Sequence, residues 1–143
     1  MNIRTVAHNS ADYWRAVDLR RKVLRTPLGL DFTAHELAHE LHEVVFVAID
    51  EGKLLGCLHM VPSSEAHVKM RQVAVEPSDQ GQGIGRALIT ESERWAVRQG
   101  YESIVLHARS TVVAFYESLG YHAEGDPFME VGIAHRRMVK RLP

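Results

Sequence analysis

The chain has 143 residues, of which 45% are hydrophobic and 24% charged, with a formal net charge of −1. These values are typical of one globular domain, which we expect to span residues 1–143. The charge balance argues against nucleic acid or an anionic membrane as partner, and no apolar run could span a bilayer or act as a signal-peptide core. A lone cysteine, Cys57, excludes an internal disulfide, so we expect a cytoplasmic protein.

The first third of the chain predicts a strand and two helices. A short strand over residues 3–7 precedes Ser10, a suitable N-cap for a helix that should end just before Pro27. Arg20 lies in the middle of that helix's apolar face. Either its stem packs while its charged head reaches solvent, or the guanidinium points into a substrate cleft. Thr33, with a glutamate three residues later, predicts a capping box for the second helix.

The second helix carries a metal-binding pattern. Residues 35–39 read H-E-L-A-H, which matches the H-E-x-x-H motif of zinc peptidases. The match is short, Glu36 already has a capping role, and no third histidine follows at the spacing of the extended motif. We therefore expect no catalytic metal. His35, His39 and His42 share one flank of the helix, which leaves metal binding there open.

Three strands follow. The first two, over residues 44–50 and 53–61, are joined by the hairpin-type turn D-E-G. The third strand changes face within its length.

In that third strand, Val68 and Met70 fall on one face of a period-two pattern, whereas Val73 and Val75 fall on the other. A single unpaired residue at 71 or 72 would bring both halves to one core, so the pattern predicts a β-bulge there. A strand buried on both faces, without a bulge, is the alternative.

The stretch that organises the chain is M-R-Q-V-A-V-E-P-S-D-Q-G-Q-G-I-G, over residues 70–85. It predicts a strand, a turn and a glycine-dense loop that opens into a helix, where bare N–H groups and the helix dipole favour a phosphate. Neither the dinucleotide fingerprint nor the P-loop fits its spacing. Gln80-x-x-Gly83-x-Gly85 does resemble the coenzyme A-binding signature of the GNAT superfamily of acyl-CoA-dependent N-acyltransferases. A plain flexible turn is the alternative.

The remaining segments are a helix and strand, a second helix and two closing strands. Ser110 and Thr111 are N-cap candidates for the second of these helices, and Gly120 should end it. The closing strands are predicted over residues 121–124 and 131–141. The order β-α-α-β-β-β-α-β-α-β-β predicts a mixed α/β fold, with a mostly antiparallel sheet flanked by about four helices. GNAT proteins share this order, and in them the bulged strand splays from its neighbour.

The segment L-H-A-R-S-T-V-V-A-F-Y-E-S-L-G-Y, over residues 106–121, resembles a second family motif, F-Y-x-x-x-G-[FY]. The resemblance implies that Tyr116 is the general acid that protonates the departing thiolate; a half-buried core aromatic is the alternative. Many relatives have an asparagine where this chain has Arg109, which leaves the role of Arg109 open.

The resemblance also implies main-chain contacts to the pantetheine and pyrophosphate of coenzyme A, with the Val73 N–H as an oxyanion donor. The expected cofactor-binding residues are Val73, Ala74, Val75, Gln80, Gly81, Gln82, Gly83, Ile84, Gly85, Arg86 and Arg109.

The motifs do not fix the base that deprotonates the amine. His107, Glu130 and His135 are candidates, as is His59, and each has an equally ordinary structural role open to it. The segments D-L-R-R-K-V, L-H-A-R and E-V-G-I-A-H-R-R-M resemble a bacterial ElaA-like subgroup of the family.

The resemblance implies an N-acetyltransferase that needs no metal and transfers acetyl from acetyl-CoA to a primary amine of a small molecule or peptide. Direct attack in a ternary complex is expected, because Cys57 has no histidine at a recognisable spacing to activate it. Arg20 is the residue expected to contact the acceptor. A non-catalytic acyl-CoA-binding or sensing module with the same fold is the alternative. Both a monomer and a homodimer are open.

Overall fold

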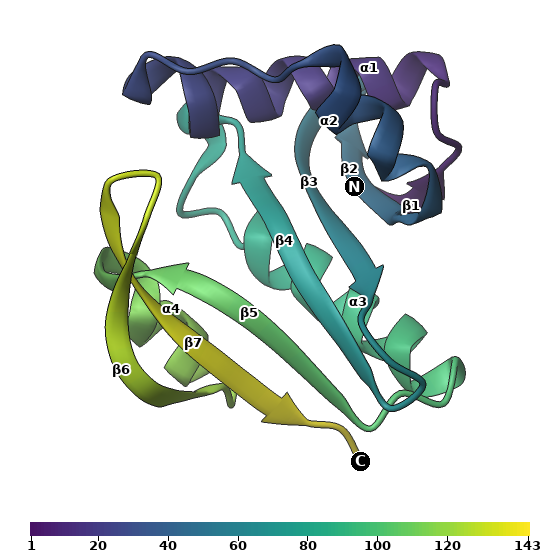
Figure 1. Cartoon of the computed structure of the whole chain (residues 1–143). Coiled ribbons are helices and arrows are strands. Elements are labelled where there is room, and N and C mark those ends of the chain that lie inside the picture. Colours follow the sequence, from purple (N-terminus) through teal and green to yellow (C-terminus); the bar gives the residue numbers. More distant parts are fainter. The chain divides into compact units, whose positions relative to one another are not determined.

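The computed structural model describes all 143 residues, with seven strands and four α-helices. The elements follow the expected order, so the predicted mixed α/β fold is confirmed (Figure 1). The chain forms two compact units, Met1–Val61 with Gln72–Ser92, and Pro62–Arg71 with Glu93–Pro143. No helix has the length and apolar character needed to cross a bilayer.

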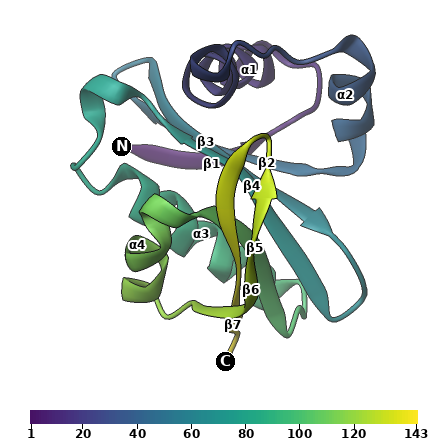
Figure 2. The same cartoon turned by 60° about the vertical axis from the view of Figure 1, so that its left-hand side comes forward.

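In the first unit, three strands form an antiparallel sheet in the order β1 (Asn2–Val6), β2 (Val44–Asp50), β3 (Lys53–Pro62). The turn between β2 and β3 places Glu51 and Gly52 at positive φ, as the predicted hairpin requires. Helices α1 (Ala11–Arg20) and α2 (Ala34–His39) lie on one side of these strands (Figure 2).

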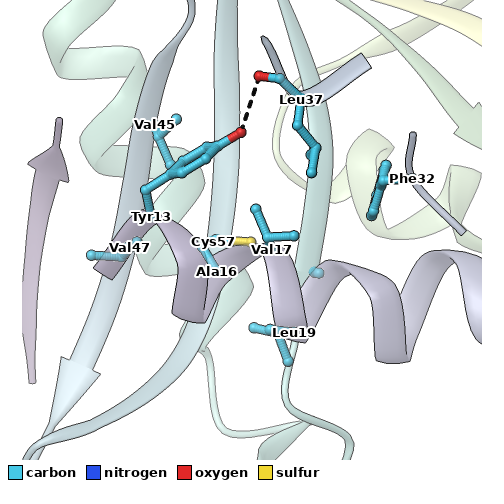
Figure 3. Packing of buried hydrophobic residues seen from close by; sticks show 10 residues of the cluster. Tyr13, Ala16, Val17, Leu19, Phe32, Leu37, Val45, Val47 and Cys57 are labelled. Atoms are coloured by element: carbon cyan, nitrogen blue, oxygen red, sulfur yellow. Dashed lines mark hydrogen bonds between the residues drawn. The ribbon is translucent and has the colours of Figure 1, made fainter. Parts of the chain in front are cut away.

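The core of the first unit lies between α1 and the sheet. Tyr13, Ala16 and Val17 of α1 pack with Val47 of β2 and Cys57 of β3 (Figure 3). The side chains of a strand alternate between its two faces, so the neighbouring position of β3 faces the opposite way.

That neighbouring position is Gly56, which contacts the first turns of α3 (Ile84–Arg98). A Cβ atom there would lie 2.8 Å from Leu88 Cδ1 and 3.0 Å from Ile84 Cγ2. A side chain at this position would force Leu88 and Ile84 to shift, so glycine favours the close packing of α3 against β3. The sheet of the first unit is therefore covered on both faces.

Both predicted helix starts in this unit are confirmed. The Ser10 side chain accepts a hydrogen bond from the Tyr13 amide, and Thr33 forms the full capping box with Glu36. The end of α1 is less abrupt than predicted. The chain continues through a π-helical turn, Arg21–Arg25, and a 3-10 turn, Thr26–Leu28, because a proline in the first turn of a new helix loses no hydrogen bond.

The irregularity predicted in β4 (His67–Val75) is present at Gln72, which has a φ of 58° in an otherwise extended strand. Its consequence for packing differs from the prediction. Ala74 is buried in the first unit's core, whereas Val73 and Val75 are only half-buried, so the expectation that these two valines join the core is wrong. Val68, Met70 and Ala74 are all buried, so the period-two burial pattern continues past Gln72 without the predicted exchange of faces.

In the second unit, the first residues of β4 pair in parallel with β5 (Ser103–Arg109). β5 pairs antiparallel with β7 (Ile133–Arg141), which in turn pairs antiparallel with β6 (His122–Glu130). Most pairings in the two units are therefore antiparallel, as predicted.

Two sequence-based boundaries in the second unit are wrong. Helix α4 (Val113–Ser118) begins after a 3-10 turn, and its N-cap is Val112 without a side-chain bond, rather than Ser110 or Thr111. Strand β6 also continues to Glu130, well past the predicted end. A shift of register between Glu124 and Phe128 accommodates the intervening glycine and proline within the strand.

Candidate active site

The glycine loop between β4 and α3 has the backbone geometry of an anion site. Gly81 and Gly83 have φ values of 82° and 84°, a region that other residues rarely adopt, while Gly85 already lies in α3. The Gln80 side chain donates to the Val75 carbonyl at 3.4 Å and so ties the loop to the end of β4.

The helix that follows begins with the bond from the Ala87 amide to the Gly83 carbonyl, 3.0 Å long. Main-chain N–H groups ahead of this bond belong to the first turn, where an α-helix has no internal acceptors for them. They lie at the positive end of α3, and Arg86 is exposed on this turn. Such a terminus binds phosphate oxygens.

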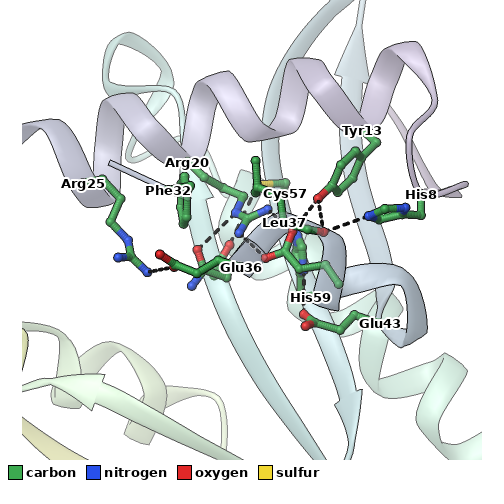
Figure 4. Close-up of polar contacts among 12 residues, drawn as sticks. His8, Tyr13, Arg20, Arg25, Phe32, Glu36, Leu37, Glu43, Cys57 and His59 are labelled. Atoms are coloured by element: carbon green, nitrogen blue, oxygen red, sulfur yellow. Dashed lines mark hydrogen bonds and ion pairs between the residues drawn. The ribbon is translucent and has the colours of Figure 1, made fainter. Parts of the chain in front are cut away.

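Arg20 of α1 forms a buried polar cluster with Tyr13, Glu40 and Gln72. Figure 4 shows Arg20 and Tyr13 in this cluster, with His59 beside them. The Arg20 side chain has no exposed surface; Nη1 and Nη2 donate to the two Glu40 oxygens at 2.9 and 2.5 Å, and Nε donates to Gln72 Oε1 at 3.1 Å. The prediction that the charged head reaches solvent is therefore wrong. The alternative was a guanidinium that points into a substrate cleft. All three guanidinium nitrogens already donate hydrogen bonds within the chain, which argues against this role.

Burial alone would raise the pKa of the Glu40 carboxyl, but hydrogen bonds from Arg20 and Tyr13 outweigh it and lower that pKa. Burial, together with the Glu40 charge, raises the pKa of the Tyr13 hydroxyl. The cluster thus holds an ionised pair and a protonated phenol. Because Gln72 is the left-handed residue of β4, the cluster also braces the irregularity that precedes Val73.

His59 lies beside this cluster and is fully buried. Its Nδ1 lies 2.9 Å from Glu43 Oε1, whereas its Nε2 has no hydrogen-bond partner. Burial lowers the pKa of His59 despite the carboxylate contact, so the ring is neutral and donates from Nδ1. Removed from solvent, it is poorly placed to exchange a proton with a substrate.

Ligand atoms of Glu40, Glu43 and His59 lie within 4.8 Å of one another. This grouping is a poor cation site, because the Glu40 oxygens already bind Arg20 and the adjacent guanidinium would repel a metal ion. The neighbouring Cys57 is also inert. Burial raises the pKa of its thiol to about 12, which leaves almost no thiolate to act as a nucleophile.

Tyr116 lies on α4 in the second unit, 7% exposed, with its ring against Phe115 and Tyr121 at centroid distances of 5.2 and 5.8 Å. Burial raises the pKa of the Tyr116 hydroxyl to about 12, so it is protonated at neutral pH. Tyr121 is different, because its hydroxyl donates to Glu93 at 2.8 Å.

The structure brings together three predicted base candidates of the second unit: His107, Glu130 and His135. Glu130 Oε1 lies 3.2 Å from His107 Nδ1, and Glu130 Oε2 lies 3.7 Å from His135 Nε2. His135 Nδ1 lies 2.7 Å from the Ile133 carbonyl and must donate to it, since a carbonyl only accepts. In a neutral ring at either position the hydrogen would lie on Nδ1 and the lone pair on Nε2, and the nearby carboxylate would stabilise an imidazolium.

Sequence reasoning missed Phe128, whose ring lies 4.9 Å from that of His107 and 6.0 Å from that of His135. Only the shifted register of β6 places it opposite His135, and no sequence pattern indicated that shift. Arg109, the last residue of β5, is also opposite His135 in the sheet, so it belongs to the same face as the cluster.

A family model for the acetyltransferase (GNAT) domain matches residues 24–142 of the chain. Human N-acetyltransferase 8B is 30% identical over 125 residues, which cover 82% of this chain and 53% of that protein. The chain spans from 29% to 53% of the length of such curated relatives.

Solved structures share the fold over nearly the whole chain. Escherichia coli ElaA has a TM-score of 0.85 at 16% identity, and covers 98% of this chain and 99% of its own. A GNAT family acetyltransferase from Elizabethkingia anophelis, with acetyl-CoA bound, has a TM-score of 0.77 at 17% identity and covers 99% and 97%.

Proposed function

Because the chain belongs to the GNAT acetyltransferase family, we propose that it transfers the acetyl group of acetyl-CoA directly to a primary amine. The observation that carries the proposal is the glycine loop at the start of α3, where left-handed Gly81 and Gly83 precede the unpaired first-turn amides. In this role the loop from Gln80 to Arg86 binds the coenzyme A diphosphate. The acceptor is a small molecule or a peptide amine, as in the aminoglycoside acetyltransferase that shares the fold.

The other cofactor contacts come from β4 and β5. Val73, Ala74 and Val75 would pair through their main chain with the amides of the pantetheine arm. The left-handed Gln72 sets the direction of the Val73 N–H, the proposed donor to the oxyanion. Arg109 would add positive charge for the cofactor.

In the proposed reaction, the neutral amine attacks the thioester carbonyl, a C–N bond forms and the C–S bond then breaks. The departing sulfur receives a hydrogen bond from the Tyr116 hydroxyl. With a pKa raised to about 12, this phenol lies roughly three units above an ordinary thiol, so it stabilises the thiolate more than it transfers its proton outright. The thiolate then takes a proton from solvent as the products leave.

The amine must lose a proton, and the cluster of His107, Glu130 and His135 is the proposed acceptor. Each ring directs its Nδ1 hydrogen to a fixed partner and keeps Nε2 free to accept. The Glu130 carboxylate then stabilises the imidazolium that forms.

The test is release of free coenzyme A thiol from acetyl-CoA across a panel of primary amines. Tyr116→Phe should lower kcat roughly a hundredfold or more, the usual range for loss of a hydrogen-bond donor to developing negative charge, while the Kd for coenzyme A stays unchanged. Tyr101→Phe removes a hydroxyl from another partly buried tyrosine and is the matched control.

An unchanged kcat for Tyr116→Phe would make Tyr116 only a core aromatic. Tight binding of acetyl-CoA by calorimetry without thiol release for any amine would instead favour a non-catalytic acyl-CoA-binding module.

A further inference from the structure

Two exposed histidines on α2 meet through the nitrogen atoms that bind metals. His35 Nε2 and His39 Nε2 lie 3.0 Å apart, and their ring centroids are 4.3 Å apart. Residues four apart share one helix face, so the backbone of α2 holds the two rings side by side. His42 lies beyond the helix, in the 3-10 turn Glu40–His42, and is not grouped with the pair as a third ligand.

The glutamate between these histidines is already engaged. Glu36 Oε1 accepts from the Thr33 amide and hydroxyl in the capping box, both at 3.3 Å, and Glu36 Oε2 lies 3.5 Å from Arg25 Nη2. A peptidase of the H-E-x-x-H type needs this carboxylate as a base on metal-bound water. The pair therefore has the ligands of that motif without its base, and hydrolysis is not expected.

We propose that His35 and His39 form a surface binding site for a divalent transition metal of tetragonal geometry, Cu²⁺ first and Ni²⁺ second. The two nitrogens make a hydrogen bond in the free protein, which requires a hydrogen on one Nε2. Moving that hydrogen to Nδ1 of the same ring frees both Nε2 lone pairs for one ion.

The distance between the nitrogens selects among metals. With metal–nitrogen bonds of about 2.0–2.1 Å, two atoms 3.0 Å apart subtend an angle of roughly 95° at the ion. A tetragonal or square-planar ion takes cis ligands at roughly 90°, whereas tetrahedral zinc requires a wider angle. The general affinity order also places Cu²⁺ above Zn²⁺. Solvent would complete the coordination, because the pair is exposed.

The site also bears on the structure around it. Bridging two positions one turn apart stabilises a helix of only six residues, which is too short to be stable by itself. The residue directly after His39 is Glu40, the buried partner of Arg20. Metal binding should therefore raise the melting temperature of the whole chain, whether or not the chain is an acetyltransferase.

The experiment titrates untagged full-length protein with CuCl₂, NiCl₂ and ZnCl₂ in a buffer with glycine as a weak competitor. Calorimetry gives the affinity, and electron paramagnetic resonance of the Cu²⁺ sample reports nitrogen ligands. We expect one strong Cu²⁺ site with two imidazole nitrogens, and a weaker zinc affinity. His35→Ala and His39→Ala should each weaken Cu²⁺ binding at least about tenfold and abolish the rise in melting temperature.

His42→Ala is the matched control, since it removes an exposed histidine three residues away and should leave the affinity unchanged. The proposal is overturned if His39→Ala binds Cu²⁺ as tightly as the parent protein. It is equally overturned if His42→Ala loses the site, or if Zn²⁺ binds the pair as strongly as Cu²⁺. Circular dichroism of each variant verifies that the fold is retained.

Discussion

The two units each contain a polar cluster of ionisable groups, and the clusters differ in how much hydrogen-bonding capacity they leave unused. In the first unit, Arg20 and Glu40 are buried, and their hydrogen-bonding groups are occupied by each other, by Gln72 and by Tyr13. In the second, His107 and His135 keep their Nε2 lone pairs, and the Glu130 carboxylate between them is 45% exposed. A group that must exchange protons needs both free capacity and access to solvent. In the second cluster His107 and Glu130 are 28% and 45% exposed, whereas His135 is buried.

The difference also separates structural from chemical roles. A buried ion pair contributes little net stability, but loss of one partner leaves an uncompensated charge in the interior. The first cluster should therefore respond to mutation through folding. The second should respond through the rate, because His107 and Glu130 are partly exposed and solvent screens the contact between them.

The largest effect is expected for Glu40→Gln, which keeps the volume but removes the charge that pairs with Arg20. Leaving the guanidinium buried without its partner should lower the free energy of unfolding by about 3–5 kcal/mol, measured by urea denaturation. Activity per folded molecule should fall far less than stability. A stable Glu40→Gln variant with greatly reduced kcat would reverse the roles assigned to the two clusters.

The pH dependence of the same variant sharpens this test. The pKa of Glu40 is lowered in the folded protein, so its stabilising contribution is present above the ordinary value of about 4.3 and is lost as pH falls through the lowered value. Glu40→Gln should lack that part of the acid unfolding.

The second prediction concerns Glu130→Gln, which keeps an acceptor for His107 but removes the charge beside His135. A carboxylate 3.7 Å from Nε2 stabilises an imidazolium by about 1–4 kcal/mol, so kcat should fall roughly tenfold or more. The urea midpoint should hardly move. Asp126→Asn removes another exposed carboxylate from β6 and serves as the control. Equal rates for both variants would remove Glu130 from the proton-accepting cluster.

A third prediction uses His59, which lies beside the first cluster. The folded chain keeps His59 neutral because burial lowers its pKa, whereas the unfolded chain binds a proton there below about pH 6.5. The unfolded state then holds more protons, so stability should fall with decreasing pH below that value, by at most about 1.4 kcal/mol per pH unit.

His59→Asn keeps a donor for Glu43 and should flatten this slope in denaturation curves between pH 7 and pH 5. His42→Asn, at an exposed position, should leave the slope as it is. A wild-type stability that does not change over this range would contradict a neutral buried ring.

The fold was largely predictable from local chemistry. The Ser10 N-cap, the Thr33 capping box and the glycine-dense loop act within a few residues, so their outcome does not depend on distant contacts. The misplaced boundary of β6, in contrast, depended on contacts with a distant segment of the chain. β6 passes through Gly125 and Pro127 only because its partner strand tolerates a shift of register, which no local pattern reports.

The candidate site was predictable residue by residue but not as an arrangement. His107, Glu130 and His135 could be named as candidates from their chemistry, while their contact depends on the registers of β5 with β7 and of β7 with β6. Arg20 shows the converse limit. Its position on an apolar helix face was clear, but its partner Glu40 lies twenty residues later, and neither reading of the sequence included that pair.

The smallest effect is expected for Glu124→Ala, which breaks an ion pair between Glu124 Oε2 and Arg137 Nη1 at 2.5 Å. This pair is as short as the contact between Arg20 and Glu40, but its side chains are 51% and 48% exposed. Water solvates both charges in the folded and unfolded states, so the loss should be below about 1 kcal/mol in urea denaturation. Both pairs have the same chemistry and length, and burial alone separates them. A loss for Glu124→Ala as large as that for Glu40→Gln would show that burial does not set the difference.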